Sequence, residues 1–216
     1  MDIFPKIDSA YVRLENGLEI RHICCRRFAS AGISVLVRTG SIHEGAMCGC
    51  GVSHFAEHMA FIGAGGRREE SVSADAAMLG AELNACTWND RTVYSADCPT
   101  ESLEKTLALL SEMLFEPNFT EGAFENERGV ILREIDMCSD DSGEKAYDNL
   151  FGKMYVSSPL RYPIIGIRKK FMGVEPPDLR GYFLDRYCAD NMCVCVASAL
   201  GHSEVFDAAA RAFGGR

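Results

Sequence analysis

The dipeptide Asn16–Gly17 stands between two runs in which apolar and polar residues alternate, "AYVRLE" and "LEIRHICC". Alternation with a period of two is typical of a half-buried strand, and Asn-Gly between two such runs is a strong signal for a hairpin. A third run, "SAGISVLVRTG", ends at Gly40 and is expected to form a third strand. The chain therefore begins with antiparallel strands, which constrains every later choice of fold.

A second hairpin is predicted where the runs 81–87 and 92–98 flank the segment "WNDR". Helices are predicted where apolar residues recur at helical spacing or where cap and proline signals occur, over 51–61, 71–79, 100–117, 120–141, 176–191 and 202–215. Whether the helix over 120–141 continues to 155 is left open, and a last strand is predicted over 192–199. Hairpins indicate an antiparallel sheet and long helices indicate a covered face. We expect an α+β fold, a two-layer domain with a mostly antiparallel sheet covered by helices on one face. The absence of a convincing linker favours a single domain over residues 1–216.

Composition excludes some classes of function. The formal charge of −9 argues against a nucleic-acid partner, because phosphate binding needs a basic surface. No stretch approaches the roughly 20 apolar residues of a membrane span. The N-terminus lacks a basic segment followed by an apolar one, so no signal peptide is predicted. The ten cysteines are therefore expected to be reduced thiols in the cytoplasm or another reducing intracellular compartment. Cys193 and Cys195 alternate along a predicted strand, so they should share one face and pack there.

The segment "GVSHFAEHMAF" holds the candidate catalytic residues. On a helix, His54 and His58 lie one turn apart, so their rings can converge on one ion, and neutral imidazole suits zinc. Zinc lowers the pKa of its bound water to about 7, and Glu57, on the same face, could take a proton from that water as a general base. The alternative is an amphipathic helix whose polar edge faces solvent.

A catalytic zinc usually has three protein ligands and one water. In "NERGVILREID", Glu127 and Glu134 share a stripe with two branched apolar residues, and a buried carboxylate needs a metal or hydrogen-bond donors. Glu134 is the candidate third ligand, with Glu127 supporting a ligand histidine. Two alternatives remain open: the glutamates could pair with arginines such as Arg128, or Cys50 could complete a Cys/His/His site.

Together these segments resemble the pitrilysin/insulinase family of zinc peptidases, the inverzincins, and within it the branch that includes mitochondrial processing peptidase. The resemblance rests on "GSIHEGAMCGCGVSHFAEHMAFIGAGGR", on the spacing from His58 to Glu134 and Glu127, and on "ELNACTWNDRTVYSAD", "SPLRYPIIGI" and "AARAFGG". It implies one zinc per domain and hydrolysis of peptide bonds. It also implies an edge strand that pairs with an extended peptide substrate, here at Asn84, Ala85 and Cys86. Cys86 departs from the family pattern.

The resemblance also implies a partner. Family enzymes are clamshells of several such domains, so a second half, on the same or a separate chain, or a homo-oligomer, is expected to complete the substrate chamber. Two other functions stay open: a non-catalytic peptide-binding or scaffold subunit, and a structural zinc protein with a closed four-ligand site. A His/His/Glu set could also hold cobalt or manganese.

Overall fold

The computed structural model describes residues 7–65 and 69–216, apart from the side chains of residues 69–71. The last two residues of the predicted zinc-helix segment, 66 and 67, lie outside these ranges. The strands are β1 (Ser9–Arg13), β2 (Glu19–Cys24), β3 (Ser30–Val37), β4 (Glu82–Thr87), β5 (Thr92–Pro99) and β6 (Met192–Ser198). They form one sheet in the order β1-β2-β6-β3-β5-β4, which leaves β1 and β4 as its edges.

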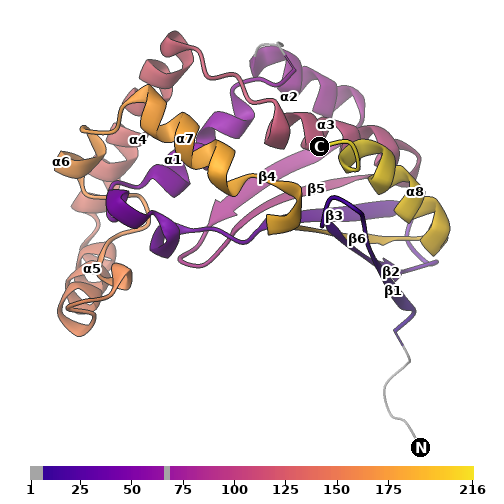
Figure 1. The fold of residues 1–216 in the computed structure, drawn as a ribbon, viewed down its shortest axis with the longest axis horizontal. Helices are drawn as coiled ribbons and strands as arrows, with labels where there is room; N and C mark the ends of the chain where they lie inside the picture. The colour runs from indigo at the N-terminus through magenta and orange to yellow at the C-terminus, as the bar shows by residue number, and fades with distance from the viewer. Residues whose placement is uncertain (1–6, 66–68) are drawn as a thin grey trace, which may run out of the picture.

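The helices gather on one face of this sheet and at one end of it (Figure 1). They are α1 (Val52–Phe61), α2 (Glu69–Met78), α3 (Leu103–Phe115), α4 (Glu121–Asp140), α5 (Ser142–Met154), the single turn α6 (Arg168–Phe171), α7 (Pro176–Arg186) and α8 (His202–Phe213). The expected α+β class is confirmed. No helix in the two described ranges is both long and apolar enough to cross a membrane.

The alternation along the central strands explains why only one face is covered. On β3, Ala31, Ile33, Val35 and Val37 are buried, whereas the residues between them are partly exposed. These four side chains pack under the helices into one hydrophobic cluster with residues of β5 and α1. We call the opposite side, which the helices leave uncovered, the open face of the sheet.

The sheet is mixed. Four of its strand pairs are antiparallel, as expected, but β2 and β6 run parallel. Strand β6 is the last strand in the chain, and it lies between β2 and β3. The first three strands therefore do not form a continuous meander, because only β1 and β2 pair as a hairpin. The alternation around Asn16–Gly17 predicts that hairpin correctly, and Gly17 has the positive φ of 89° that its turn requires.

The long helical stretch after residue 120 breaks at Asp141. Its backbone is extended there, and its carboxylate accepts hydrogen bonds from the backbone N–H groups of Gly143 and Glu144. Asp141 therefore ends α4 and caps α5, because an aspartate at this position satisfies the free donors of a new helix. The break turns α5 aside, so it projects away from the sheet next to α4 (Figure 1).

Candidate active site and metal centre

Helices α1 and α4 bring three potential metal ligands together. The Nε2 atoms of His54 and His58 lie 3.9 Å and 3.6 Å from the same carboxylate oxygen of Glu134. One ligand atom from each residue lies within 4.8 Å of the other two, and this is the one such group of three or more in the described part of the chain. The structure thus brings together the three residues that the sequence singles out.

These distances fit a metal better than direct hydrogen bonds. Both exceed the usual length of an N–H···O bond, which is about 2.7–3.2 Å. A tetrahedral ion with ligands at about 2.0–2.1 Å separates neighbouring ligand atoms by about 3.4 Å. The side chains therefore leave a gap that is close to the size of an ion, and two imidazoles with one carboxylate form a donor set that suits zinc.

A carboxylate from α4 orients the second histidine. His58 Nδ1–H donates to Glu127 at 2.9 Å, which leaves Nε2 facing Glu134. Burial lowers the pKa of His58, but the hydrogen bond to Glu127 and the charge of Glu134 outweigh it, so the pKa is raised. Glu127 thus has the position expected of a partner that fixes the ring of a metal ligand.

The His54 side chain is largely buried, and this burial determines its protonation. Burial, with a smaller contribution from His58, lowers the pKa of His54 to about 3. The ring is therefore neutral near pH 7, the form in which histidine binds a metal. Its Nδ1 atom is buried and has no hydrogen-bond partner among the described residues.

Glu57 is held by a residue that sequence reasoning missed. The hydroxyl of Thr87, at the end of β4, donates to a carboxylate oxygen of Glu57. Burial raises the pKa of Glu57, although the bond from Thr87 and the charge of His58 act in the other direction. Nothing in the sequence around Thr87 marks this role, because the contact depends on how α1 packs over β4.

A buried carboxylate fixes the start of α1 and was also missed. Glu44 is 3% exposed, and its oxygens accept hydrogen bonds from the backbone N–H groups of Gly49 and Ser53 and from the Ser53 hydroxyl. Ser53 in turn accepts from the Tyr182 hydroxyl on α7. An acid at the N-terminal turn of a helix also interacts favourably with the helix dipole. Glu44 therefore ties the loop, α1 and α7 into one unit.

Two glycines allow the segment that follows α5 to pack against the loop that precedes α1. Gly51 has φ of 71°, and a Cβ atom on it would lie 2.2 Å from the carbonyl oxygen of Ile165. Gly166 has φ of 90°, and a Cβ atom on it would lie 2.7 Å from the carbonyl carbon of Cys50. Any side chain at either position would separate the two segments, so the sequence "SPLRYPIIGI" helps to set where α1 begins.

A cavity of about 560 Å³ opens beside the candidate metal ligands, and we call it the α5 cavity. His54, Glu57 and Thr87 form part of its wall, and Ala85 and Cys86 of β4 another part. Helix α5 supplies Glu144, Tyr147, Asp148 and Phe151 opposite them. A smaller cavity of about 280 Å³ lies on the other side of Glu57, between His58, Glu127, Asn84 and Ala85. The two hollows follow the outer edge of β4.

The three predicted substrate-binding residues lie on that edge strand. The Asn84 side chain accepts a hydrogen bond from the Ala85 N–H at 2.8 Å, and Cys86 is exposed. Ala85 points towards the helix layer, as does Tyr94 opposite it, whereas Asn84 and Cys86 point towards the open face.

The competing explanations receive less support. Arg128 pairs with Glu125 at 3.3 Å and donates to the Val174 carbonyl, while Glu127 and Glu134 turn towards the histidines. Cys50 does not belong to the one group of ligand atoms found in residues 7–65 and 69–216. The polar edge of α1 is not freely solvated either, because the His54 and His58 side chains are 18% and 19% exposed.

Comparison with known families decides what kind of protein this is. Residues 27–167 match the family described as insulinase, peptidase family M16. The chain belongs to this family. The matched range includes both histidines, both glutamates of α4 and the edge strand, so the expected resemblance is confirmed.

Curated relatives of this M16 chain include the beta subunit of mitochondrial-processing peptidase from Caenorhabditis elegans, 32% identical over 86% of the chain and 40% of the relative. An uncharacterized zinc protease from Rickettsia felis is 28% identical over 93% of the chain and 48% of the relative. The chain thus spans less than half the length of these relatives.

Solved structures agree on the fold. A protease from Helicobacter pylori superposes with a TM-score of 0.91 at 25% identity, covering 96% of this chain and 50% of that one. A peptidase M16 inactive domain from Pseudomonas fluorescens superposes with a TM-score of 0.89 at 18% identity, with the same coverage. The fold is therefore common to proteases and to a domain described as inactive, so activity has to be argued from the site.

Proposed function

We propose that this chain is the zinc-binding part of an M16 endopeptidase that hydrolyses peptide bonds in extended peptides. The single observation that carries the proposal is the convergence of His54, His58 and Glu134, with Glu57 on the same helix face. Zinc would be held by these three residues, one ion per domain. When bound, zinc would supply a water whose pKa is about 7 and a Lewis acid for the scissile carbonyl.

Glu57 has the role of general base. It takes a proton from the attacking water and passes it to the leaving amine, which requires a carboxylate that is neither too acidic nor a metal ligand. Burial raises the pKa of Glu57 in the direction that this proton transfer needs. The Thr87 hydroxyl holds one carboxylate oxygen of Glu57, and the Glu57 side chain also lines the α5 cavity.

The edge of β4 is the proposed binding site for substrate backbone. Trp88 N–H donates to the Arg91 carbonyl at 2.7 Å, which marks the first hydrogen-bonded pair of the β4–β5 hairpin. Because hydrogen-bonded pairs alternate in an antiparallel ladder, the N–H and C=O groups of Ala85 point away from β5. An extended peptide could add there as a further strand, beside Glu57.

The α5 cavity supports a preference for a positively charged substrate side chain. Glu144 and Asp148 lie one turn apart on α5 and both line the cavity. Burial, together with the charge of Glu144, raises the pKa of Asp148. A substrate guanidinium or ammonium group would relieve this repulsion, and a guanidinium could bind both carboxylates.

A second half is the proposed partner. The curated relatives are more than twice as long as the stretch that they share with this chain, and the M16 structures superpose on it over about half their own length. Groups from another domain, on the same or a separate chain, would close the chamber over β4. A non-catalytic scaffold is the alternative function, because the Pseudomonas fluorescens domain has this fold and is described as inactive.

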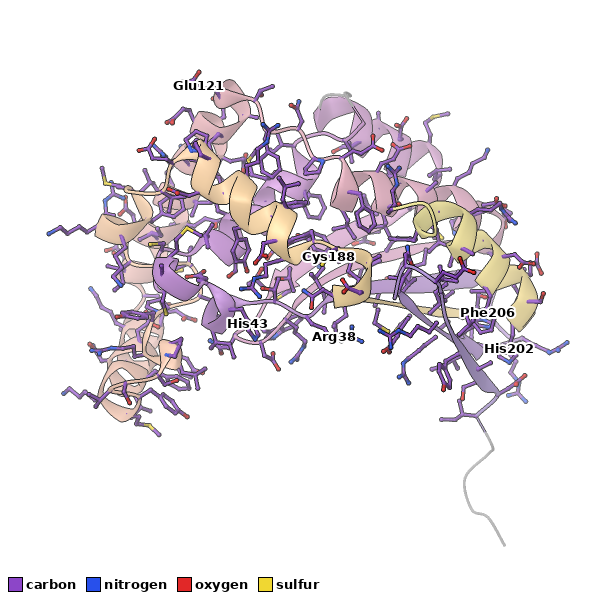
Figure 2. The ribbon with its side chains drawn as sticks, viewed as in Figure 1. Arg38, His43, Glu121, Cys188, His202 and Phe206 are labelled. Atoms are coloured by element: carbon purple, nitrogen blue, oxygen red, sulfur yellow. The ribbon has the colours of Figure 1, made fainter. Side chains whose placement is uncertain are left out.

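The test is a paired measurement on the assembled peptidase. Glu57→Gln should keep its zinc and its affinity for peptide while hydrolysis falls by roughly 100-fold or more, the usual contribution of a general base. The matched control is Glu121→Gln on the first turn of α4, far from the site (Figure 2), which should retain full activity. Unchanged hydrolysis by Glu57→Gln would reject the assignment. Zinc and peptide binding without any cleavage by the unmodified chain would favour the scaffold.

A further inference from the structure

Two thiols meet on the open face of the sheet, on the opposite side from the helix layer. Cys193 and Cys195 are alternate residues of β6, so they project to the same side, and their Sγ atoms are 3.8 Å apart. Val194 and Val196 project the other way into the core. Strand β6 is held on both sides, by β2 and by β3, so its backbone is among the most restrained in the sheet.

We propose that Cys193 and Cys195 form a bidentate binding site for a thiophilic cation such as Cd²⁺, separate from the candidate zinc centre. The site uses residues that the peptidase chemistry leaves unused. It does not depend on the proposed function of His54, Glu57 and His58.

The separation of the two sulfur atoms matches a chelate. Two thiolates on a tetrahedral zinc, each at about 2.3 Å, are about 3.8 Å apart, and the larger Cd²⁺ needs a slightly wider separation. The two sulfurs, 3.8 Å apart, are therefore already close to chelating distance, so binding requires little rearrangement.

The same backbone disfavours a disulfide. Alternate residues of a strand are about 6.4–6.8 Å apart, and their parallel Cβ atoms are separated by a similar distance. A disulfide needs Cβ atoms about 3.5–4.5 Å apart. Closing that difference would bend β6 and break hydrogen bonds to β2 or β3, so this pair is suited to chelation and not to oxidation.

The electrostatic surroundings favour one thiolate. The hydrogen bond from Cys195 and the nearby Arg21 guanidinium lower the pKa of Cys193 to about 7, against burial and the charge of Glu19. The same sulfur–sulfur hydrogen bond, with burial, raises the pKa of Cys195. The two shifts have opposite signs, so deprotonation begins at Cys193, and metal binding displaces the protons that the pair still holds.

The site is reachable from the side of Cys195, whereas Cys193 is only 7% exposed. Cys195 lines a cavity of about 560 Å³ on the open face, together with Arg21, Ser34 and Asp97. Arg38 lies on this same side of the sheet (Figure 2) and pairs with Glu19 at 3.3 Å. Among these side chains of the open face, the two thiols are the soft metal donors. Binding forms two S–Cd bonds and releases to buffer every proton that the two thiols still carry, with no change in oxidation state.

Cadmium titration of the 216-residue chain, preloaded with zinc, tests the proposal. The ultraviolet thiolate-to-cadmium charge-transfer band should saturate at one equivalent, with native mass spectrometry confirming one bound Cd²⁺. Cys193→Ser and Cys195→Ser should each weaken binding by roughly 100-fold or more, because the second thiolate binds intramolecularly. The matched control, Cys24→Ser with Cys25→Ser, removes two thiols from consecutive residues and should bind as the unmodified chain does.

Two outcomes would overturn the proposal. One is an undiminished cadmium charge-transfer band in the Cys193→Ser/Cys195→Ser double variant, once circular dichroism has shown that this variant is folded. If the serine substitutions prevent folding, Cys195→Ala is the variant to test. The other is a Cys193–Cys195 disulfide recovered from folded protein after mild peroxide treatment, because the strand geometry predicts that none forms. Loss of peptidase activity in Glu57→Gln has no bearing on either result, so the two proposals can fail separately.

Discussion

At the candidate metal centre, each side chain has a distinct environment. Glu127 binds the ring of His58, burial keeps His54 neutral, and burial raises the pKa of Glu57 against the hydrogen bond from Thr87. The spacing of the two histidines and the apolar setting of Glu134 were sufficient to predict the cluster, because helical periodicity fixes which residues share a face. Thr87 and Glu44 could not be predicted in the same way, since their partners are distant in sequence and are met only through packing.

The hydrogen bond between Glu127 and His58 predicts an effect on metal affinity. Glu127→Gln removes the charge that orients the ring, so the zinc dissociation constant should rise by roughly 10–100-fold, as for other partners of metal-bound histidines. Competition with a chelator of known affinity measures it. Glu125→Gln, which removes the partner of Arg128 instead, is the control and should leave zinc affinity unchanged. Equal affinities for all three proteins would show that Glu127 does not support the ligand.

At the scale of single elements, local signals located most helices and strands, and tertiary contacts decided the rest. The alternation of β6 predicts a strand but carries no information on its position, and the structure inserts it parallel to β2. The stretch after residue 120 has helical periodicity on both sides of Asp141, so the sequence left open whether one helix or two would form. The capping hydrogen bonds of Asp141 explain why α5 turns aside and forms a wall of the α5 cavity.

This position of α5 leads to a prediction on substrate preference. If Glu144 and Asp148 bind a cationic side chain, Glu144→Gln/Asp148→Asn should lower kcat/KM for an arginine-containing peptide by at least about tenfold, since each hydrogen bond to a charged group contributes about 1.5–3 kcal/mol. The matched peptide with glutamine in place of arginine should be cleaved equally by both enzymes. The assembled peptidase is used for all four measurements. An equal loss for the two peptides would point to a structural effect of α5 instead.

Across the whole molecule, a chain of polar side chains joins the beginning and end of the described sequence. Asp8 accepts from His202 Nε2 at 3.0 Å, the Nδ1 atoms of His202 and His22 are 2.8 Å apart, and His22 Nε2 lies 3.1 Å from the Ser198 hydroxyl. Only one proton fits between the two Nδ1 atoms, so the two rings cannot both be fully protonated. His202 begins α8 at one end of the molecule, well away from His43 (Figure 2).

This chain of side chains predicts how stability changes with pH. Burial and the neighbouring His202 lower the pKa of His22. Below the ordinary histidine pKa of about 6.5, the unfolded chain therefore binds more protons than the folded chain, and the free energy of unfolding falls as pH falls. The free energy of unfolding is measured in urea between about pH 8 and pH 5.5, a range that brackets that ordinary pKa. Its change with pH is the slope that the prediction concerns.

His22→Asn should reduce the slope, and His43→Asn, which removes a histidine outside this chain of side chains, should not. The comparison is made as a difference from the unmodified protein, because the other titrating groups then cancel. A slope that is identical in all three proteins would mean that His22 does not resist protonation in the folded state.

Zinc stoichiometry and affinity, measured by native mass spectrometry with chelator competition, test the central claim that His54, His58 and Glu134 form one zinc site. The unmodified chain, Glu57→Gln and Cys50→Ser should each bind one zinc with similar affinity. Glu134→Gln should weaken binding by at least the roughly 10–100-fold that loss of an outer partner costs. Unaltered zinc affinity in Glu134→Gln, or loss of zinc in Cys50→Ser, would contradict the account.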